Sequence, residues 1–584
     1  NGGSLAAGTI AIAPYNDGAL DLGGTGLAGL QLSQALVSAF ASGAVISLGA
    51  ADGATANSIL SEGALSFANA LVALNSTGGL TQTGSLSANN LALTGTSLAL
   101  NGQINATALS LTASGAISQT GGSGLTLSSL SGTGGSIALT GGANSIASVT
   151  GLTAAGGIAI NDAGALSVAG GISAGSSIAL ATPTLDLGNT LISPHVSLAA
   201  DTINDAGGAI QTGNGTVDIS PLTATRAVDL GGSAAGLDLS GTLLGAISAA
   251  RLDISTQGSI VADGAASLST PLLSLSANGI SFAGTLSLPG TLALASGAGI
   301  TSSAGNVLSA SLLQQGGQIV GDVDLGQGAS SFGTLGSFTL GNGGFAQGSA
   351  QTPGSGNFTL ADTQALTITG AISTSGGLVL RSAGAITQAS ALSGQQISLT
   401  GSTLTLAAPI TAGTLALSAS NGVSESTGSI DATLLSGNIS GDATLDAAGN
   451  SIGTLVNFSD TGTLRLRDAG ALSQAGSLSA GNAILTSNGL NLSGSVLVPG
   501  TLLLASTGSV LQSGGAVSAG TLSSLGTVQG DLIMAQPGNL FPVVNNLAAT
   551  GAIDLTSAAA LAQTGALSAG TVTLTAPSLA LNGA

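Results

Sequence analysis

Short alternating pieces of large aliphatic and small residues recur along the whole chain. Typical pieces are residues 91–93, 98–100 and 415–417, each with Ala between two leucines. A period of two places neighbouring side chains on opposite faces, so each piece predicts a β-strand with its aliphatic side chains buried. Gly, Asn, Ser and occasional Pro separate the pieces and predict tight corners between the strands.

The strands recur with a fixed spacing, which is visible in four copies of one opening. Each copy places a Gln two residues after a Leu or Ile anchor, and the following anchors come in steps of 6, 5 and 7 residues. The four copies begin at Leu80, Ile386, Leu472 and Leu561. One turn therefore takes 18 or 19 residues, and 20 where a corner widens. Standard two-turn units lie near residues 80–117, 386–423, 472–510 and 561–584, the last one incomplete.

Three strands per turn of 18–20 residues predict an all-β solenoid, a right-handed parallel β-helix with its core inside the coils. Equivalent anchors should then lie above one another at about 4.8 Å. The expected inward columns include Leu80, Leu98 and Ile117 in one stretch and Ile386, Leu404 and Val423 in another. At this turn length the chain should form about 30 coils.

A larger duplication is superimposed on the short repeat. Residues 9–14 match residues 216–221 at an offset of about 207 residues, so superrepeat 1 covers about 1–207 and superrepeat 2 begins at about 208. Both copies continue into a run with helical apolar spacing, which predicts short helical excursions from the solenoid. The runs contain Leu36, Val37 and Phe40 in the first copy and Leu243, Leu244 and Ile247 in the second.

We expect residues 1–584 to form one continuous solenoid that is a piece of a longer chain. No polar cap is visible at Asn1 or at Ala584, and an uncapped solenoid end exposes unpaired strands. Both ends should therefore contact more protein, either flanking repeats or another copy stacked end to end. Weakly charged sides would also permit lateral association, because little electrostatic repulsion opposes it.

Composition restricts the partners and the membrane topology. The chain has 95 Gly, no Cys, no Trp and only 5% charged residues, while 43% of its residues are hydrophobic, which argues against disorder. Polar residues interrupt every apolar run, so no transmembrane helix is predicted. The net charge of -19, with no lysine, makes nucleic acid an unsuitable partner.

Several motifs resemble the β-helical repeat region of filamentous haemagglutinin-like exoproteins. They are the Gly-Ala-(Leu/Ile)-(Ser/Thr)-Gln openings, the Asn-Ser-Ile segments that precede residues 160–166 and 464–472, and residues 226–232. The amino-terminal secretion domain of that family is not visible. The resemblance implies two-partner secretion through an outer-membrane exporter, an extracellular or cell-surface position, and a role in adhesion, biofilm or surface filaments.

Two glycine motifs match patterns known from enzymes without the context that those patterns require. Residues 24–29 satisfy G-x-G-x-x-G, but a chain this rich in glycine produces such matches by chance, and we interpret them as a corner. Residues 449–453 fit a nucleophile elbow around Ser451, yet the equivalent residues 143–147 lack both glycines. We expect no catalysis at either motif.

The polar residues that could hold a metal or act in catalysis are few. His195 is the only histidine and follows Pro194, so we expect a loop histidine and no histidine metal cluster. The acidic pairs Asp201/Asp205 and Asp322/Asp324 could bind calcium, but they lie outside any Gly-Gly-x-Gly-x-Asp array, and we expect solvated corner carboxylates. We therefore expect no catalytic, cofactor or metal site.

These observations favour a structural or adhesive extracellular fibre or cell-surface filament protein that is not an enzyme. The alternative is a carbohydrate-active β-helix enzyme, a polysaccharide lyase or hydrolase. Such enzymes need clustered carboxylates and aromatic platforms, and Tyr15 is the only tyrosine here. Ice binding by ordered Thr rows is less well supported, because Thr403 and Thr405 align with Ser97 and Ala99 in the first unit. A host surface or a glycan could be the ligand.

Overall fold

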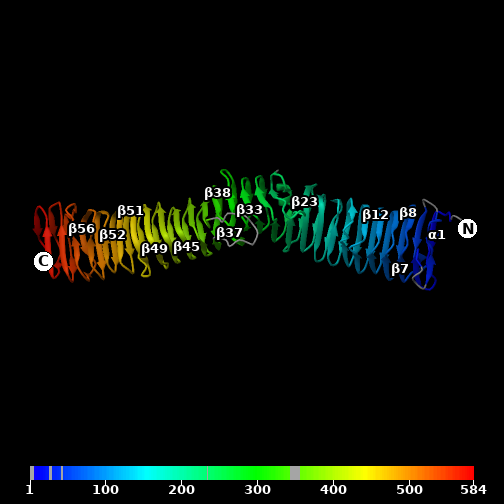
Figure 1. The fold of residues 1–584 in the computed structure, drawn as a ribbon, viewed down its shortest axis with the longest axis horizontal. Coiled ribbons are helices and arrows are strands. Elements are labelled where there is room, and N and C mark those ends of the chain that lie inside the picture. The colour runs from blue at the N-terminus through cyan, green and yellow to red at the C-terminus, as the bar shows by residue number, and fades with distance from the viewer. Residues whose placement is uncertain (1–4, 25–28, 41–43, 233, 342–354, 584) are drawn as a thin grey trace. The chain divides into compact units, whose positions relative to one another are not determined.

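The protein is a parallel β-solenoid of about 25 coils, in which 64% of the residues lie in strands and 2% in helices. The computed structural model describes residues 5–24, 29–40, 44–232, 234–341 and 355–583. It comprises two compact units, Asn1–Ala293 and Leu294–Ala584, each a stack of coils. Unit 1 runs from blue to green in Figure 1, and unit 2 from green to red. The chain ends for which we expected contacts with further protein, Asn1 and Ala584, lie outside the described residues.

A coil has three sides, which are formed by three separate strands in some coils, such as β40 (Phe358–Asp362), β41 (Leu366–Ile368) and β42 (Ile372–Thr374), and by only two in others. In unit 1, β11 (Ser97–Leu100) forms one side and β12 (Gln103–Ala113) forms the other two. Along β12 the buried positions alternate through Ile104 and Ala106 and then shift by one residue to Leu109. The chain turns this corner without Gly or Pro and keeps its ladder to the next coil, which is why the predicted second and third strands merge.

The inward columns lie where the spacing of the anchors places them. Leu98 pairs with Leu80 on one side and with Ile117 on the other, and all three are at most 1% exposed. In unit 2, Leu404 pairs in the same way with Ile386 and Val423. The predicted columns are confirmed, and burying each aliphatic anchor contributes about 1.5–3 kcal/mol to folding.

The number of coils is smaller than predicted because some coils are much longer than 20 residues. Leu80 and Leu98 are 18 residues apart, whereas Val217 pairs with Leu252, which lies 35 residues further along the chain. The extra residues of that coil form one additional strand, β27 (Leu237–Leu239), and a helix, whereas β26 (Val228–Leu230) continues the ladder to the next coil. The prediction of about 30 coils was wrong, since the helical excursions were not counted as insertions into a coil.

Both predicted helical excursions are present, and both are single turns. They are α1 (Gln34–Val37) and α2 (Gly241–Gly245), and in each the hydroxyl of a preceding serine accepts a hydrogen bond from a helix N–H. This is the usual N-cap arrangement. Neither helix is long enough to cross a bilayer, and these are the helices of the described residues.

The chain before each helix follows the same path in both copies of the duplication. In the first copy, β2 (Ala19–Leu22) pairs with β3 (Leu30–Leu32). In the second copy, β26 (Val228–Leu230) pairs in the same way with β27 (Leu237–Leu239). Each copy thus carries two parallel strands followed by a capped turn of helix.

Replacing Ile410 tests the assignment of inside and outside. Ile410 is 1% exposed in β47 (Ile410–Ala419), whereas the next residue, Thr411, points outward. Ile410→Asp would bury a carboxylate without a partner and should lower the free energy of unfolding by several kcal/mol. Thr411→Asp stays exposed but places a carboxylate opposite Asp431, so it should cost no more than about 1 kcal/mol. Chemical denaturation checks both variants, and equal midpoints would contradict the assignment.

Candidate functional site

The glutamines of the four openings are buried inside the solenoid. The side chains of Gln82, Gln388 and Gln474 have no solvent exposure, and Gln563 is 8% exposed. Their amides bond backbone groups at the following corner. The Gln388 amide, for example, donates to the carbonyl of Ser390 at 2.8 Å. These glutamines therefore satisfy corner groups that would otherwise be buried without partners.

A second buried motif, which we call the amide junction, joins such a glutamine to an asparagine in the next coil. Gln119 and Asn144 donate to each other's oxygens at 2.7 and 2.9 Å. Gln512 and Asn539 repeat both bonds at 2.8 Å. In each junction the asparagine oxygen also accepts a backbone N–H, and its amide donates to a backbone carbonyl. The junction is a structural device that holds a wide corner.

The third junction carries a carboxyl group where the others have an amide. Asn450 donates to Glu425 Oε2 at 2.8 Å, but Glu425 Oε1 has no hydrogen-bond partner and the side chain is only 7% exposed. Burial raises the pKa of Glu425 above its ordinary value of 4.5, against the hydrogen bonds from Asn450 and Ala447 and with the help of the Asp446 charge. A proton on Oε1 would replace the missing amide hydrogen.

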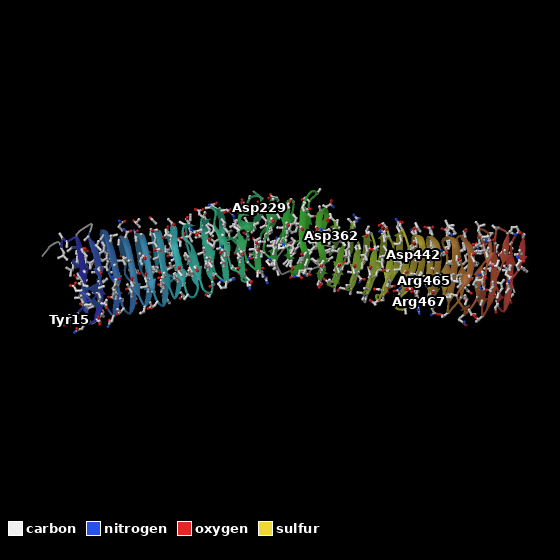
Figure 2. All side chains as sticks on the ribbon, turned by 180° about the vertical axis from the view of Figure 1, so that it is seen from behind. Tyr15, Asp229, Asp362, Asp442, Arg465 and Arg467 are labelled. Carbon is white, nitrogen blue, oxygen red and sulfur yellow. The ribbon has the colours of Figure 1, made fainter. Side chains whose placement is uncertain are left out.

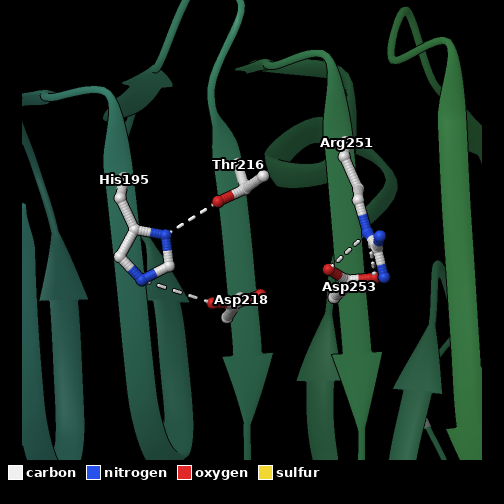
Figure 3. A network of polar contacts seen from close by, with 5 residues as sticks. All are labelled: His195, Thr216, Asp218, Arg251 and Asp253. Carbon is white, nitrogen blue, oxygen red and sulfur yellow. Dashed lines mark hydrogen bonds and ion pairs between the residues drawn. The ribbon is translucent and has the colours of Figure 1, made fainter.

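The strongest cluster of charged side chains lies on the outer face of unit 1 (Figure 3). His195 Nδ1 lies 2.7 Å from Thr216 Oγ1, and His195 Nε2 lies 3.4 Å from Asp218 Oδ2. One coil further, Arg251 pairs with Asp253 at 2.7 Å. His195 is the first residue of β23 (His195–Asp205), so the prediction of a loop histidine was wrong. Its strand starts there because His195 pairs in register with Thr216.

This cluster brings together a hydroxyl, an imidazole and a carboxylate, the types of group used in nucleophilic catalysis. Its setting does not support that chemistry. The side chains of His195 and Asp218 are 43% and 44% exposed. Backbone N–H groups at this face are engaged in the parallel ladder and cannot form an oxyanion hole. Burial and the Asp253 charge raise the pKa of Asp218, while His195 and Arg251 lower it. We interpret the cluster as a surface ion network.

A buried carboxyl group, Asp229, and an exposed one, Asp263, lie close together near the second helical excursion. Asp229 is 1% exposed, and its Oδ2 accepts the N–H of Ala234 at 2.5 Å. Burial, with help from the hydrogen bond and charge of Asp263 and the charge of Asp238, raises the pKa of Asp229 to about 6. Asp229 therefore keeps its proton to a higher pH than an ordinary aspartate does.

The same arrangement occurs in the first copy of the duplication. Oxygens of Asp21 and Glu62 lie within 3 Å of the point where a side chain of Gly24 would begin. Gly232 has Asp229 and Asp263 in the equivalent positions. The Asp-Leu-Gly-Gly sequence shared by both copies therefore leaves space for two carboxyl groups. The sequence alone does not reveal this use of the Asp-Leu-Gly-Gly motif, because the second carboxyl group comes from another coil.

The acidic pairs that we considered as calcium ligands accept hydrogen bonds from other groups of the protein. Asp201 accepts the N–H and the hydroxyl of Thr223, both at 2.7 Å, whereas Asp205 accepts hydrogen bonds from Gly207 and Ser240. Asp322 accepts from Ser355 and Asn357, and Asp324 accepts from Gly326. Among the described residues, no three acidic or histidine side chains converge on a point that could hold a metal ion.

The two glycine motifs also form no site. In residues 449–453, Asn450 belongs to an amide junction and Ser451 is an exposed residue at the start of β51 (Ser451–Arg467) rather than the tip of an elbow. Of residues 24–29, the stretch 25–28 lies outside the described residues.

A single row of hydroxyl side chains runs along one side of unit 2. Thr405 stacks on Thr387, which stacks on Thr367, and the row continues on the other side through Ser424. It then passes through Thr444 and ends at Arg465, which is exposed, as is Arg467; both are labelled in Figure 2. Our alignment of Thr405 with Ala99 compared distant copies and missed its neighbours. The row is one residue wide, so the paired rows that motivated the ice-binding alternative are not formed.

One open groove crosses four consecutive coils of unit 2 and encloses about 670 Å³. It lies at the corner between the second and third sides. It is lined by Thr374, Ser375, Ser393, Gly394, Gln395, Thr411, Ala412, Gly413, Asp431 and Thr433. A smaller depression of about 360 Å³ continues it past Asn357 and Gln396. The spacing of the anchors gives no sign of this groove.

Changing Glu425 to glutamine should stabilise the protein at neutral pH. With a raised pKa, the stability that protonated Glu425 contributes is present below pH 4.5 and is lost as pH rises through the raised pKa. Glu425→Gln restores the amide hydrogens and should raise the free energy of unfolding by about 1–3 kcal/mol at pH 7. The gain should disappear in acid. Hydrogen exchange of residues 425–452 as a function of pH measures it.

The intact junctions provide the matched control. Gln512→Glu should reproduce the Glu425 arrangement in another coil and introduce a loss of protection that grows with pH. If Glu425→Gln and Gln512→Glu both leave the pH dependence of exchange unchanged, the carboxyl group at position 425 is not a protonated substitute for an amide.

Asp229 should make unit 1 less stable as the pH rises. Its pKa rises from 3.8 to about 6 in the folded state, so its contribution is complete below pH 3.8 and is lost through about pH 6. Asp229→Asn should remove about 1–2 kcal/mol of this pH dependence. Hydrogen exchange of residues 229–239 is the measurement. Asp52→Asn in an exposed hairpin is the control and should leave that exchange unchanged.

A family model described as repeats of unknown function (DUF5649) matches residues 355–403 and 480–548 of the chain. Both matched segments lie in unit 2, and the first includes much of the groove. No curated protein and no solved structure has significant similarity to the chain. The matched repeats carry no assigned activity.

Proposed function

We propose that the chain is a structural and adhesive segment of an extracellular fibre or a bacterial cell-surface filament. The observation that carries this proposal is the parallel ladder of each unit, which continues from coil to coil beneath outer faces of small, uncharged side chains. Such a stack is stiff along its ladder and offers long, regular faces to a partner. Filament proteins need these properties, and they need no convergent catalytic groups.

The low charge of the outer faces supports association with further copies. The chain carries 24 acidic and 5 basic residues among 584, so large areas of each face are neutral. Serine and threonine hydroxyls occupy part of these areas, as in the row through Thr405. Copies could therefore approach side by side, or stack end to end, without strong electrostatic repulsion. Self-association of this kind is part of the proposal.

The motifs described for the filamentous haemagglutinin-like exoproteins support a position outside the cell. Export through an outer-membrane partner, adhesion and a place in a biofilm matrix belong to the same proposal. Antibody labelling of intact cells that produce the protein tests the position. Labelling that requires permeabilised cells would contradict it.

A carbohydrate-active enzyme is the second candidate, and the carboxyl pair Asp229/Asp263 is the observation that favours it. Glycosidases use two carboxyl groups, one of them with a raised pKa. Here Asp229 is 1% exposed, so a polysaccharide could contact only the exposed Asp263. One accessible carboxyl group fits a structural role better than catalysis by two.

Sedimentation velocity of the purified chain tests self-association directly. The proposal predicts species that grow with protein concentration, and growth that persists at high salt, because charge contributes little to the contact. Electron microscopy of the same samples should show elongated particles. A chain that stays monomeric at high concentration and high salt would contradict assembly.

A further inference from the structure

The groove of unit 2 owes its shape to small residues on the inside of the corner. Ala412 pairs with Gly394 on one side and with Ala432 on the other, so no large inward side chain fills the corner from within. A side chain on Gly394 would begin 2.7 Å from Thr374 Oγ1, and one on Gly413 would begin 2.8 Å from the carbonyl oxygen of Gln395. The glycines allow the coils to draw inward here.

Hydroxyl groups at other corners of this unit are occupied by the protein itself. Ser390 donates to the carbonyl of Thr369 at 2.6 Å, and Thr427 donates to the carbonyl of Ala407 at 2.7 Å. In each case the hydroxyl bonds the coil before it, which fixes the corner. This is the ordinary structural use of a serine or threonine at a turn.

Most polar side chains of the groove are different. Thr374 and Ser375 donate to backbone carbonyls of the protein. Within the described part of the chain, however, the side chains of Ser393, Gln395, Thr411, Asp431 and Thr433 have no hydrogen-bond or ion-pair partner in the protein. Donors and acceptors therefore recur on successive coils, at about 4.8 Å, along an open groove. They are available to a ligand that lies along the stack.

The chemistry of the lining identifies the class of ligand. No Arg or Lys lines the groove, and Asp431 is its one charged residue, so an anionic polymer would be repelled. Large apolar side chains are also missing from the lining, which makes it unsuitable for a lipid or an apolar peptide. Hydroxyl and amide groups without partners suit a ligand rich in hydroxyl groups.

We propose that this groove binds a linear, uncharged polysaccharide, with the sugar chain lying across successive coils. The inference rests on the adhesive part of the proposed function and names its ligand class. The glycan hydroxyls would exchange hydrogen bonds with Ser393 and Thr411 on one wall and with Gln395 at the corner. Binding along several coils lets weak individual contacts add up.

Isothermal titration calorimetry of the full chain with defined hexasaccharides tests the proposal. The probes are neutral cello-, manno- and chito-oligosaccharides, with oligogalacturonate as the anionic comparison. We expect at least one neutral series to bind and oligogalacturonate not to bind. The double variant Thr411→Val with Gln395→Ala removes donors and acceptors from the groove and should weaken binding at least about tenfold.

Thr405→Val is the matched control, because Thr405 is a half-exposed threonine on another side of the same unit. It should bind the oligosaccharide like the native chain. The proposal is overturned if no neutral series binds, if only oligogalacturonate binds, or if the groove variant binds as tightly as the control. Hydrogen exchange of both variants verifies that the coils remain folded.

The outcomes separate this inference from the proposed function. If no glycan binds but the chain still self-associates, the glycan inference is wrong and the proposed filament function is unaffected. Cleavage of the bound oligosaccharide, detected by chromatography, would support the groove as a glycan site and contradict a purely adhesive function. Binding without cleavage, abolished in the groove variant, supports both.

Discussion

The backbone ladder between successive coils is the constraint on which the rest of the structure depends. Each N–H and C=O in a strand pairs with the coil above or below, so a side chain is fixed above its equivalent. Leu98 has to lie between Leu80 and Ile117 for this reason. Additional residues can enter only where the ladder is interrupted. The insertion between Val217 and Leu252 accordingly adds one strand, β27, and a helix, while β26 keeps its ladder to the next coil.

The same ladder creates a requirement for polar groups in the interior. At a wide corner the chain leaves the ladder, and its N–H and C=O groups turn inward without partners. Gln119 and Asn144 supply donors and acceptors there while filling space as an aliphatic pair would. At Glu425 a carboxyl group takes the amide's place, which leaves Oε1 without a partner and raises the pKa of this side chain by burial. The buried polar side chains of these junctions therefore mark corners of the coil and do not indicate a catalytic site.

The sequence predicted what depends on period and spacing, and missed what depends on the path of a corner. Strands, inward columns and the helices near Leu36 and Leu243 all follow from local patterns, and all are present. The inward position of Gln388 could also have been predicted, since it shares the period of Ile386 in its strand. The approach of Asp263 to Asp229 could not, because it depends on how the intervening 33 residues are routed. The groove also escaped prediction, since it arises from Gly394 and Ala412 being small on neighbouring coils, and each looks like an ordinary corner residue alone.

The direction of the ladder also determines how such a stack responds to mechanical load. Its hydrogen bonds point along the stacking direction, while the covalent chain runs across it. Tension along the stack is carried by these hydrogen bonds, coil after coil in series, so it separates coils rather than stretching covalent bonds. A released coil of 18 residues, such as the one from Leu80 to Leu98, would extend to roughly 60 Å at 3.3–3.6 Å per residue. A tether built in this way lengthens stepwise and dissipates energy at each step.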